Sequence, residues 1–260
     1  MANYYLEVKN VSRGKSHSIT RRASYIFGEK LRDNYRCENC YKNRSDVLFR
    51  EVFLPHSAPS KFGDIQTLCD EIDKAEKRYD ARTAKELIGS LPNELNVSEI
   101  VKIVMEFISV HFTKRGLAVM AAIHEGRNVE DPSHNNSHVH ILVTTRTLGE
   151  NGFNPKKLRD LDQKKNVGVW RESWAKIQNR AYEHNKLDIR VSHECLEVQG
   201  IDREPIPRLS CIDMQREKKG QRTKVGDRKR EVLEKNRQKL LEKERQNRER
   251  ELEHSMSRSR

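Results

Sequence analysis

The chain has 260 residues, of which 35% are charged, and a formal net charge of +12. This length allows one medium-sized domain with an appendage and enough apolar residues for a substantial core. No run approaches the length of about 18 apolar residues that a membrane-spanning helix requires, and the first residues form no apolar signal segment. We therefore expect a soluble, cytoplasmic protein without membrane insertion.

The basic charge is concentrated near the C-terminal end of the sequence. Residues 214–260 contain 17 Lys/Arg and nine Asp/Glu, a net charge of +8, which leaves +4 for residues 1–213. Apolar residues are sparse after residue 213, which favours a long solvated helix or partial disorder over a packed core. We predict a folded domain over 1–213 and a basic tail over 214–260. A polyanion such as nucleic acid suits this charge, although a solvated helix without specificity has the same composition.

The five cysteines indicate a reducing compartment, because their number is odd and their spacing is not that of a disulfide framework. Cys37 and Cys40 form one Cys-x-x-Cys unit, but the chain contains no second unit that would complete a zinc knuckle. The sequence leaves the role of this pair open.

The first predicted elements are a strand at residues 4–8, a turn, and a helix that Ser16 or Ser18 can cap. The apolar stripe of this helix consists of Ile19, Ala23, Ile26 and Phe27. At about 100° per residue, Tyr25 falls on the opposite face, which is polar and basic and includes Arg21 and Arg22. The tyrosine is therefore either presented to a ligand or an ordinary surface aromatic residue.

The following elements alternate between strands and helices. The expected strands are residues 47–54, 83–88, 117–123, 137–145 and a short one at 187–191. The expected helices are residues 60–78, a helix that Asn96 caps and that ends near His111, and residues 168–185. Residues 33–46 and 146–166 read as polar loops. The fold class we predict is α+β, a central antiparallel sheet flanked by helices, with a charged helical C-terminal tail.

The central motif is His138-Val-His140, which continues into the apolar residues 141–143. Alternate residues of a strand point to the same face, so the imidazoles of His138 and His140 should lie side by side. His124 ends the preceding predicted strand, and it would join them if the two strands pair antiparallel. Three neutral imidazoles can hold a divalent metal ion and leave positions for a substrate oxygen.

Two alternatives to this metal site are left open by the residues alone. A His-x-His pair is commonly two ordinary surface residues, and His134 competes with His124 as the third ligand.

A metal site combined with the accessible Tyr25 suggests phosphoryl transfer through a covalent tyrosine intermediate, because a phenol attacks poorly at neutral pH unless a cation or base assists it. No phosphate-binding Gly-rich loop accompanies these residues, so we expect no nucleotide hydrolysis.

The chain resembles the MobA/MobL (MobQ-type) plasmid relaxases, which belong to the His-hydrophobic-His (HUH) single-strand endonucleases. The resemblance spans about residues 1–205. Its blocks are Tyr4-Tyr5, Ser24-Tyr25, Val52-Phe-Leu-Pro55, Leu91-Pro-Asn-Glu-Leu95, Ala122-Ile-His124, Asn136-Ser-His138-Val-His140-Ile-Leu142, Trp170-Arg-Glu-Ser-Trp174, Ser192-His193 and Glu197-Val-Gln-Gly-Ile201. The family often has Asn-Pro-His where this chain has Asn136-Ser137-His138.

The resemblance implies a bacterial relaxase that nicks one strand of a transfer origin and later rejoins it. Tyr25, in preference to Tyr4 or Tyr5, matches the nucleophile, which would take the 5′-phosphate and leave a free 3′-OH. Glu86 aligns with a supporting acidic residue, and Arg21, Arg22 and Arg32 are candidates for DNA contact. His124, His138 and His140 match the ligands of Mg²⁺ or Mn²⁺. The implied partners are single-stranded transfer-origin DNA, accessory relaxosome proteins and a type IV coupling protein.

Two rival functions fit parts of the same sequence. A rolling-circle replication initiator has its tyrosine after the His-x-His motif, and Tyr182 in Tyr182-Glu-His-Asn-Lys186 loosely imitates that order. Trp170 and Trp174 favour Tyr182 as a helix-packing residue instead. The second rival is a non-catalytic basic protein that binds nucleic acid through phosphate contacts and whose histidines are incidental.

Overall fold

The computed structural model describes residues 4–14, 18–41, 44–127 and 135–258. It divides into two compact units, Met1–His193 and Glu194–Arg260. Residues 194–213, which the sequence analysis grouped with the folded domain, belong here to the C-terminal unit.

The first unit is built on an antiparallel sheet with the strand order β1-β5-β7-β6-β4. Its strands are β1 (Leu6–Ser12), β4 (Val47–Phe53), β5 (Arg82–Ser90), β6 (Leu117–His124) and β7 (His138–Gly149), and the short β8 (Gly152–Phe153) pairs with the end of β7. The predicted antiparallel α+β class is confirmed. The strands expected at residues 4–8, 47–54, 83–88, 117–123 and 137–145 each overlap one of these observed strands.

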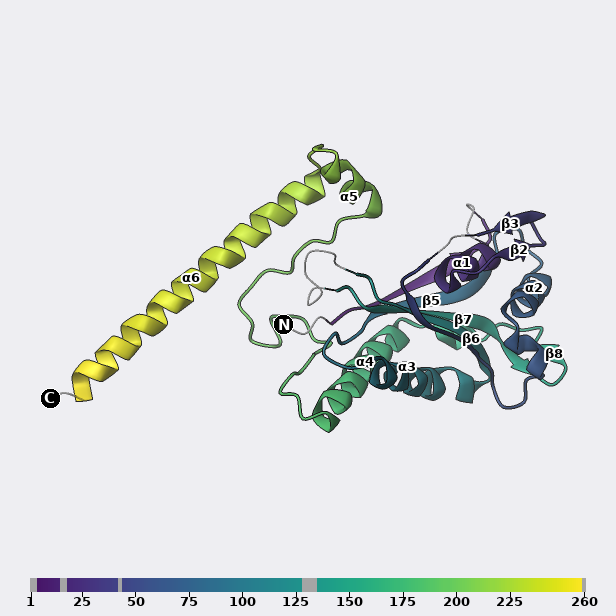
Figure 1. Cartoon of the computed structure of the whole chain (residues 1–260), viewed down its shortest axis with the longest axis horizontal. Helices are drawn as coiled ribbons and strands as arrows, with labels where there is room; N and C mark the ends of the chain where they lie inside the picture. The colour runs from purple at the N-terminus through teal and green to yellow at the C-terminus, as the bar shows by residue number, and fades with distance from the viewer. Residues whose placement is uncertain (1–3, 15–17, 42–43, 128–134, 259–260) are drawn as a thin grey trace. The chain divides into compact units, whose positions relative to one another are not determined.

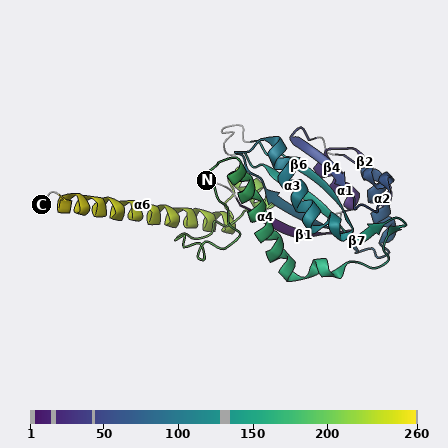
Figure 2. The same cartoon turned by 90° about the horizontal axis from the view of Figure 1, so that it is seen from below.

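Helices cover both faces of this sheet (Figures 1 and 2). The helices α1 (Ile19–Phe27) and α2 (Ile65–Ala75) pack on one face, and α3 (Val97–His111) and α4 (Lys164–His184) pack on the other. Single turns of 3₁₀ helix occur at Ser60–Gly63, Thr113–Arg115 and Arg159–Asp162. All eight residues of β6 are buried, and the seven before His124 alternate between the two apolar clusters. A strand covered on both faces is a continuous apolar run, as this one is up to His124.

The helix starts are fixed by the side chains that the sequence indicated. Ser18 accepts a hydrogen bond from the backbone N–H of Arg21, and Asn96 accepts one from that of Glu99. Trp174 is fully buried between the sheet and α3, and its indole N–H donates to the carbonyl of Ser90. Both tryptophans of α4 belong to the core, since Trp170 is only 1% exposed.

Two predicted loops contain strands. The polar segment 33–46 includes part of a hairpin of β2 (Leu31–Asp33) and β3 (Glu38–Cys40), whose three-residue strands are too short to show a periodicity. Residues 146–166 are not wholly a loop, because β7 continues to Gly149 and β8 folds back against it. In the hairpin, Cys40 is buried while Cys37 is exposed.

The strand predicted at residues 187–191 is wrong. This segment has no sheet partner in the structure. The side-chain amide of Asn179 on α4 instead bonds both backbone groups of Val191, with its Nδ2 donating to the carbonyl and its Oδ1 accepting from the N–H. The apolar residues Leu187 and Ile189 pack against the core beside α4, which explains their alternation without a strand.

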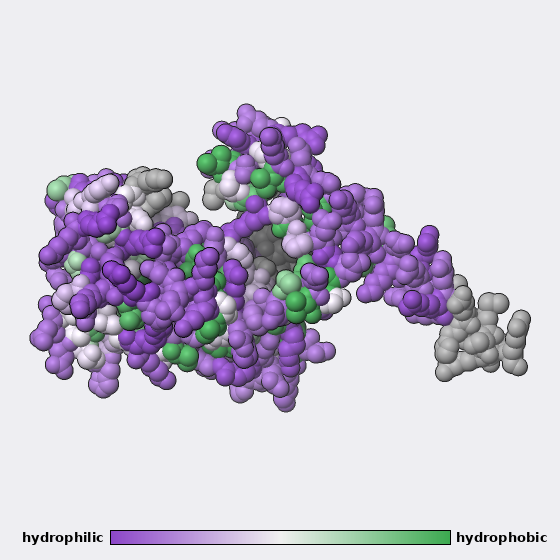
Figure 3. Space-filling view, turned by 180° about the vertical axis from the view of Figure 1, so that it is seen from behind, coloured by the Kyte–Doolittle hydropathy of each residue, from purple (hydrophilic) through white to green (hydrophobic). Residues whose placement is uncertain are grey.

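The second unit contains α5 (Cys211–Lys218) and the long α6 (Lys224–Arg258). Val232 of α6 is 1% exposed, and the side chain of Asn236 bonds both backbone groups of Glu204. Most of the described α6 side chains are exposed, and hydrophilic residues dominate the surface in Figure 3. Among the helices that the structure describes, none combines the length and the apolar content that crossing a membrane requires.

Candidate metal centre and nucleophile

Strand pairing brings three histidines together on the face of the sheet that α1 covers. His124 of β6 lies directly opposite His138 of β7, and His140 follows on the same face of β7. The ring centroids are 5.2 Å apart for His124 and His138, 5.1 Å for His138 and His140, and 4.8 Å for His124 and His140. One ring nitrogen of each residue lies within 4.8 Å of the others. The antiparallel register, which the sequence could only assume, therefore assembles the predicted cluster.

Each ring is oriented by a hydrogen bond that determines its tautomer. The Nε2 of His124 lies 2.7 Å from the carbonyl oxygen of Ile26, and the Nδ1 of His138 lies 2.6 Å from that of Asn136. A carbonyl can only accept, so these nitrogens carry the hydrogen and the opposite nitrogens carry lone pairs. The Nδ1 of His124 is buried and has no hydrogen-bond partner among the described residues. A buried lone pair beside two similar rings fits a metal ligand.

Glu86 orients the third ring. It lies on β5, the neighbour of β7, and its Oε1 accepts a hydrogen bond of 2.8 Å from the Nδ1 of His140. Burial opposes ionisation of this carboxyl, but hydrogen bonds from His140 and Arg22 outweigh burial and hold the pKa of Glu86 below its ordinary value. Glu86 is thus an ionised partner that leaves the Nε2 of His140 as the lone-pair nitrogen.

Burial also keeps the imidazoles neutral. Desolvation lowers the pKa of His124 to about 4, although the hydrogen bond to Ile26 opposes this shift. Desolvation likewise lowers the pKa of His140, against the effect of Glu86. Neutral imidazole is the form that binds a metal ion, so the protein presents these two rings ready for one at neutral pH.

Tyr25 is presented to this cluster by α1, which packs across the same face of the sheet. The Tyr25 ring is half-buried, and it meets the His140 ring edge-on with 6.4 Å between the centroids. On the opposite face of α1, the side chains of Ile19, Ala23 and Ile26 are fully buried. The predicted apolar stripe therefore anchors the helix, and the tyrosine lies beside the imidazoles.

Two guanidinium groups flank the Tyr25 ring, one from α1 and one from the segment before β4. The Cζ atom of Arg22 lies 4.9 Å from the ring centroid and that of Arg44 lies 4.8 Å from it. Arg22 is held by two-pronged hydrogen bonds to Glu86, with Nε–O distances of 3.0 Å. Arg44 is held in the same way by Asp46, at 2.8 and 2.6 Å. Each guanidinium is thus fixed beside the aromatic ring by an ionised carboxylate, in the position of a cation–π contact.

Sequence reasoning missed Arg44 and Asp46. The hydrogen bond from Arg44 lowers the pKa of Asp46 to about 2, so the carboxyl is ionised. Hydrogen bonding to Asp46 raises the pKa of Arg44, and the Tyr25 hydroxyl adds to this rise. The only local signal was an Arg-x-Asp spacing just before a strand, which is common and has no specific meaning by itself.

The three arginines predicted to contact DNA have different positions. Arg22 lies at the site, within 3.4 Å of the Nδ1 of His140. Arg21 forms a 2.5 Å ion pair with Glu38 of the β2–β3 hairpin. Arg32 is exposed on β2, and its backbone is bonded by the side chain of Gln66 on α2. His134, the alternative third ligand, lies outside the described residues.

Tyr182, the rival nucleophile, is part of the core of the first unit. Its side chain is 1% exposed, and burial raises its pKa above the ordinary tyrosine value. The hydroxyl contacts the carboxylate of Glu94 at 3.5 Å. A buried phenol beside a carboxylate cannot receive a phosphodiester without opening the fold, so Tyr182 is a poor candidate for the replication-initiator reaction.

Comparison with known proteins identifies the family. The model of the MobA/MobL family matches residues 17–219, which is most of the chain. The chain belongs to the MobA/MobL family. The resemblance drawn from the sequence blocks is thereby confirmed, and the matched range includes every residue of the candidate metal centre and Tyr25.

Curated MobA/MobL relatives carry mobilisation and transfer names. A probable mobilization protein MobA of Bifidobacterium longum is 31% identical over 248 residues, with 79% of this chain and 42% of that protein covered. A mobilization protein MobL of Acidithiobacillus ferridurans is 27% identical, with 80% and 62% covered. A conjugal transfer protein TraA of Agrobacterium fabrum is 24% identical, with 79% and 21% covered. The chain thus spans less than two thirds of each of these relatives.

Solved structures share the fold of this MobA/MobL protein. One, described as the molecular basis of vancomycin resistance transfer in Staphylococcus aureus, has a TM-score of 0.67 and 28% identity, with 75% of this chain and all of that chain covered. The metal-bound structure of the conjugative relaxase TrwC with oriT DNA has a TM-score of 0.50 and 12% identity, with 88% and 90% covered. At that identity the likeness to TrwC concerns the fold alone.

Proposed function

We propose that this chain is a DNA relaxase for conjugative mobilisation, which nicks one strand of a transfer origin and later rejoins it. The observation that carries the proposal is the position of Tyr25 on α1, with its ring centroid 6.4 Å from that of His140 and 4.9 and 4.8 Å from the Cζ atoms of Arg22 and Arg44. His140 is one of three imidazoles whose ring nitrogens lie within 4.8 Å of one another. The family and the names of the relatives support the same reading.

The proposed reaction is a transfer between two phosphodiesters. The phenolic oxygen of Tyr25 attacks the phosphorus, an O–P bond forms, and the bond from phosphorus to the 3′-oxygen breaks. The phenolic proton passes to solvent, and the departing 3′-oxygen takes up a proton to become a free hydroxyl. The 5′-phosphate remains covalently attached to Tyr25. Attack by a 3′-hydroxyl reverses these changes, so the strand is rejoined without an external energy source.

His124, His138 and His140 would hold the divalent ion, which we propose to be Mg²⁺ or Mn²⁺. The buried lone pair of His124 Nδ1 and the bonds that orient all three rings fit this group. When bound, such an ion supplies positive charge to the phosphate oxygens. Glu86 positions His140, and Arg22 is a candidate contact for the negatively charged phosphate, because its guanidinium lies between Glu86 and the Tyr25 ring.

The proposed substrate is single-stranded transfer-origin DNA. Among the predicted contacts, Arg22 lies at the site, and Arg21 and Arg32 remain proposals on neighbouring exposed surface. Accessory relaxosome proteins and a type IV coupling protein are proposed as partners, since the relatives carry mobilisation and conjugal-transfer names. The functional domain is proposed to extend over residues 1–213, with the basic tail over 214–260 adding charge for the DNA.

The test compares two tyrosine variants. The protein is incubated with Mn²⁺ and a pool of single-stranded oligonucleotides that tile the non-coding DNA around its gene, and then separated on a denaturing gel. The wild type should give a protein–DNA adduct that survives SDS. Tyr25→Phe should give none, because it lacks the attacking oxygen, yet should bind DNA with nearly unchanged affinity. Tyr182→Phe is the matched control and should retain the adduct.

The other outcomes separate the rival functions. Loss of the adduct in Tyr182→Phe but not in Tyr25→Phe would indicate the replication-initiator arrangement. Salt-dependent binding of every oligonucleotide without any adduct would indicate a non-catalytic nucleic-acid-binding protein. Equal loss of binding and of the adduct in Tyr25→Phe would assign a structural role to Tyr25.

A further inference from the structure

A basic cavity lies at the end of the sheet opposite the histidine cluster. Its volume is about 750 Å³, and it is lined by the end of α2, the start of β5, the end of β7 and residues 155–162. Its rim on β5 includes Arg82, six residues before Ile88, the partner of His140 in the sheet. At about 3.3 Å per residue along β5, the lining residues Arg82 and Lys85 lie about 20 Å and about 10 Å from Ile88. None of the residues proposed for nicking lines it.

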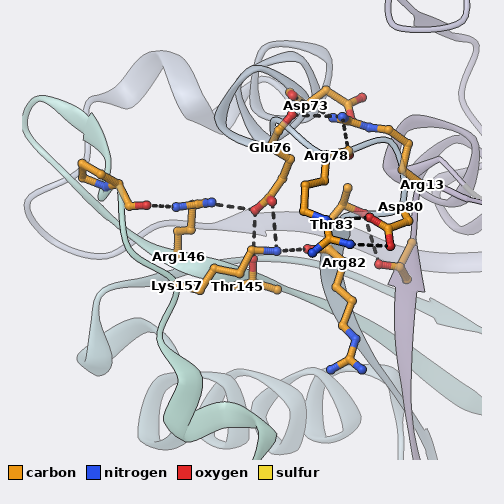
Figure 4. A network of polar contacts seen from close by, with 12 residues as sticks. Arg13, Asp73, Glu76, Arg78, Asp80, Arg82, Thr83, Thr145, Arg146 and Lys157 are labelled. Atoms are coloured by element: carbon orange, nitrogen blue, oxygen red, sulfur yellow. Dashed lines mark hydrogen bonds and ion pairs between the residues drawn. The ribbon is translucent and has the colours of Figure 1, made fainter.

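The cavity has an excess of fixed positive charge. Seven of its lining side chains are Lys or Arg, and three are Asp or Glu. The carboxylate of Glu76 is buried and holds the Nε of Arg146 and the Nζ of Lys157, each at 2.9 Å, as Figure 4 shows. Asp162 similarly holds the buried Lys85 at 2.9 Å. The acidic groups are therefore already paired, and they fix several of the cations in position.

Two further cations have no such partner. Lys77 and Arg159 are exposed cavity residues, and neither has an ion pair or a side-chain hydrogen bond among the residues that the structure describes. The charges of these two side chains are therefore free to bind an incoming anion. Three paired carboxylates cannot neutralise seven cations, so the cavity favours an anionic ligand.

An exposed aromatic ring lies in the loop between α2 and β5, which also contains Lys77. Tyr79 is 78% exposed, and its neighbours Arg78 and Asp80 both line the cavity. A large aromatic side chain left in solvent between charged residues contributes nothing to the core. Cationic side chains beside an exposed aromatic ring are the combination that binds a nucleic acid strand, because the cations bind phosphates and the ring stacks on a base.

We infer that this cavity is a second DNA-binding site, which holds backbone phosphates of the strand away from the nick, with Tyr79 as a stacking platform for a base. The inference deepens the proposed function and rests on it for the identity of the nucleic acid. A nucleic acid strand suits the site better than a small phosphate ligand, because the cations come from four chain segments and Tyr79 belongs to the loop that supplies Lys77 and Arg78. The site would increase affinity without taking part in the chemistry.

The experiment measures binding in the full chain, with a chelator present so that no cleavage occurs. Fluorescence anisotropy of an oligothymidylate of about 30 nucleotides is recorded between about 50 and 200 mM salt. In Lys77→Ala/Arg159→Ala, the slope of log affinity against log salt should become shallower by about 1.4, since each phosphate of a single strand that the protein neutralises contributes about 0.7 to this slope. The control Lys102→Ala/Lys176→Ala removes the same charge from exposed positions on α3 and α4 and should change the slope much less.

The stacking residue is tested separately. Tyr79→Ala should weaken binding about five-fold or more, while Tyr79→Trp should retain it, because a larger ring stacks at least as well. Neither substitution alters a buried contact, so circular dichroism and the melting temperature should stay those of the wild type. Wild-type affinity of Tyr79→Ala would overturn the stacking role.

The remaining outcomes decide between ligands. If Lys77→Ala/Arg159→Ala and the control Lys102→Ala/Lys176→Ala have equal slopes of log affinity against log salt, the proposal of a second DNA-binding site is overturned. If calorimetry shows saturable binding of thymidine monophosphate, and this binding disappears in Lys77→Ala/Arg159→Ala, the cavity is a site for a small phosphate ligand. That result would overturn the proposal that it binds a nucleic acid strand. Because the binding assay measures no cleavage, a failure to form the Tyr25 adduct does not affect its result. If the protein nicks DNA but the cavity variant has the wild-type slope of log affinity against log salt, only the cavity proposal is overturned.

Discussion

At the residue scale, the candidate metal centre depends on which nitrogen of each imidazole carries its hydrogen. The hydrogen-bond acceptors that impose this choice are the carbonyls of Ile26 and Asn136 and the carboxylate of Glu86. Two of these acceptors are backbone carbonyls, and any residue type could supply them. The ligands and Glu86 could be named from the sequence, whereas the two backbone carbonyls that orient His124 and His138 could not.

Glu86 gives the most direct test of this orientation. Glu86→Gln keeps the size of the side chain but removes its charge, so the His140 ring loses a strong acceptor. We expect affinity for Mn²⁺ to fall by about 10- to 100-fold, as is typical when the partner of a ligating histidine is removed. Isothermal titration calorimetry measures this affinity. Glu51→Gln, on an exposed position of β4, is the control and should bind Mn²⁺ like the wild type.

The stability of the metal-free protein should depend on pH through His124. Its pKa is lowered to about 4 by burial, against 6.5 for an exposed histidine. Between these values the unfolded chain takes up a proton that the folded protein refuses, so the free energy of unfolding should fall as the pH decreases from 6.5 toward 4. The decrease should reach at most about 3 kcal/mol. His140 shifts in the same direction and adds to it.

Urea unfolding with a chelator at pH 7 and pH 5 measures this dependence. In His124→Gln the difference between the two pH values should be smaller than in the wild type, because the substituted residue does not titrate. An identical difference in both proteins would show that His124 is not the group responsible.

At the scale of elements, the packing of α4 on the sheet explains a glycine in β5. A Cβ atom on Gly89 would lie 2.9 Å from the ring of Trp174, closer than packed atoms approach. Gly89→Ala should therefore displace the indole and strain its hydrogen bond to Ser90. We expect a loss of about 1–3 kcal/mol in the free energy of unfolding, measured by denaturant titration. Gly63→Ala, where a Cβ atom meets nothing within 4 Å, is the control.

The elements that sequence reasoning located correctly are those with a long periodic pattern or a capping residue. The helix after Asn96 shows an apolar period because one of its faces is buried, and the strand at 117–123 shows a continuous apolar run because both of its faces are buried. The β2–β3 hairpin and the segment 187–191 show the limit. Three-residue strands carry no period, and Leu187 and Ile189 alternate because they pack beside α4 without joining a sheet.

At the scale of the whole molecule, the tail and the folded unit make separate contributions. Both apolar clusters of the first unit consist of residues between Leu6 and Val191. Deleting residues 214–260 should therefore leave the melting temperature of that unit nearly unchanged. It removes a net charge of +8, so binding to all DNA sequences should weaken and its salt dependence should become shallower. Anisotropy titrations measure both, and unchanged affinity would indicate that the tail binds protein instead.

The sequence by itself determined the family, the α+β class, the three histidines and Tyr25 as the residues to examine, because each of these depends on residue type and short spacing. Only the tertiary structure decided that Arg22, Glu86 and His140 form one chain of contacts, although up to 118 positions separate them. It also decided the place of Arg44 and of the basic cavity. Such contacts arise from strand register and helix packing, which join distant segments and leave no local period to read.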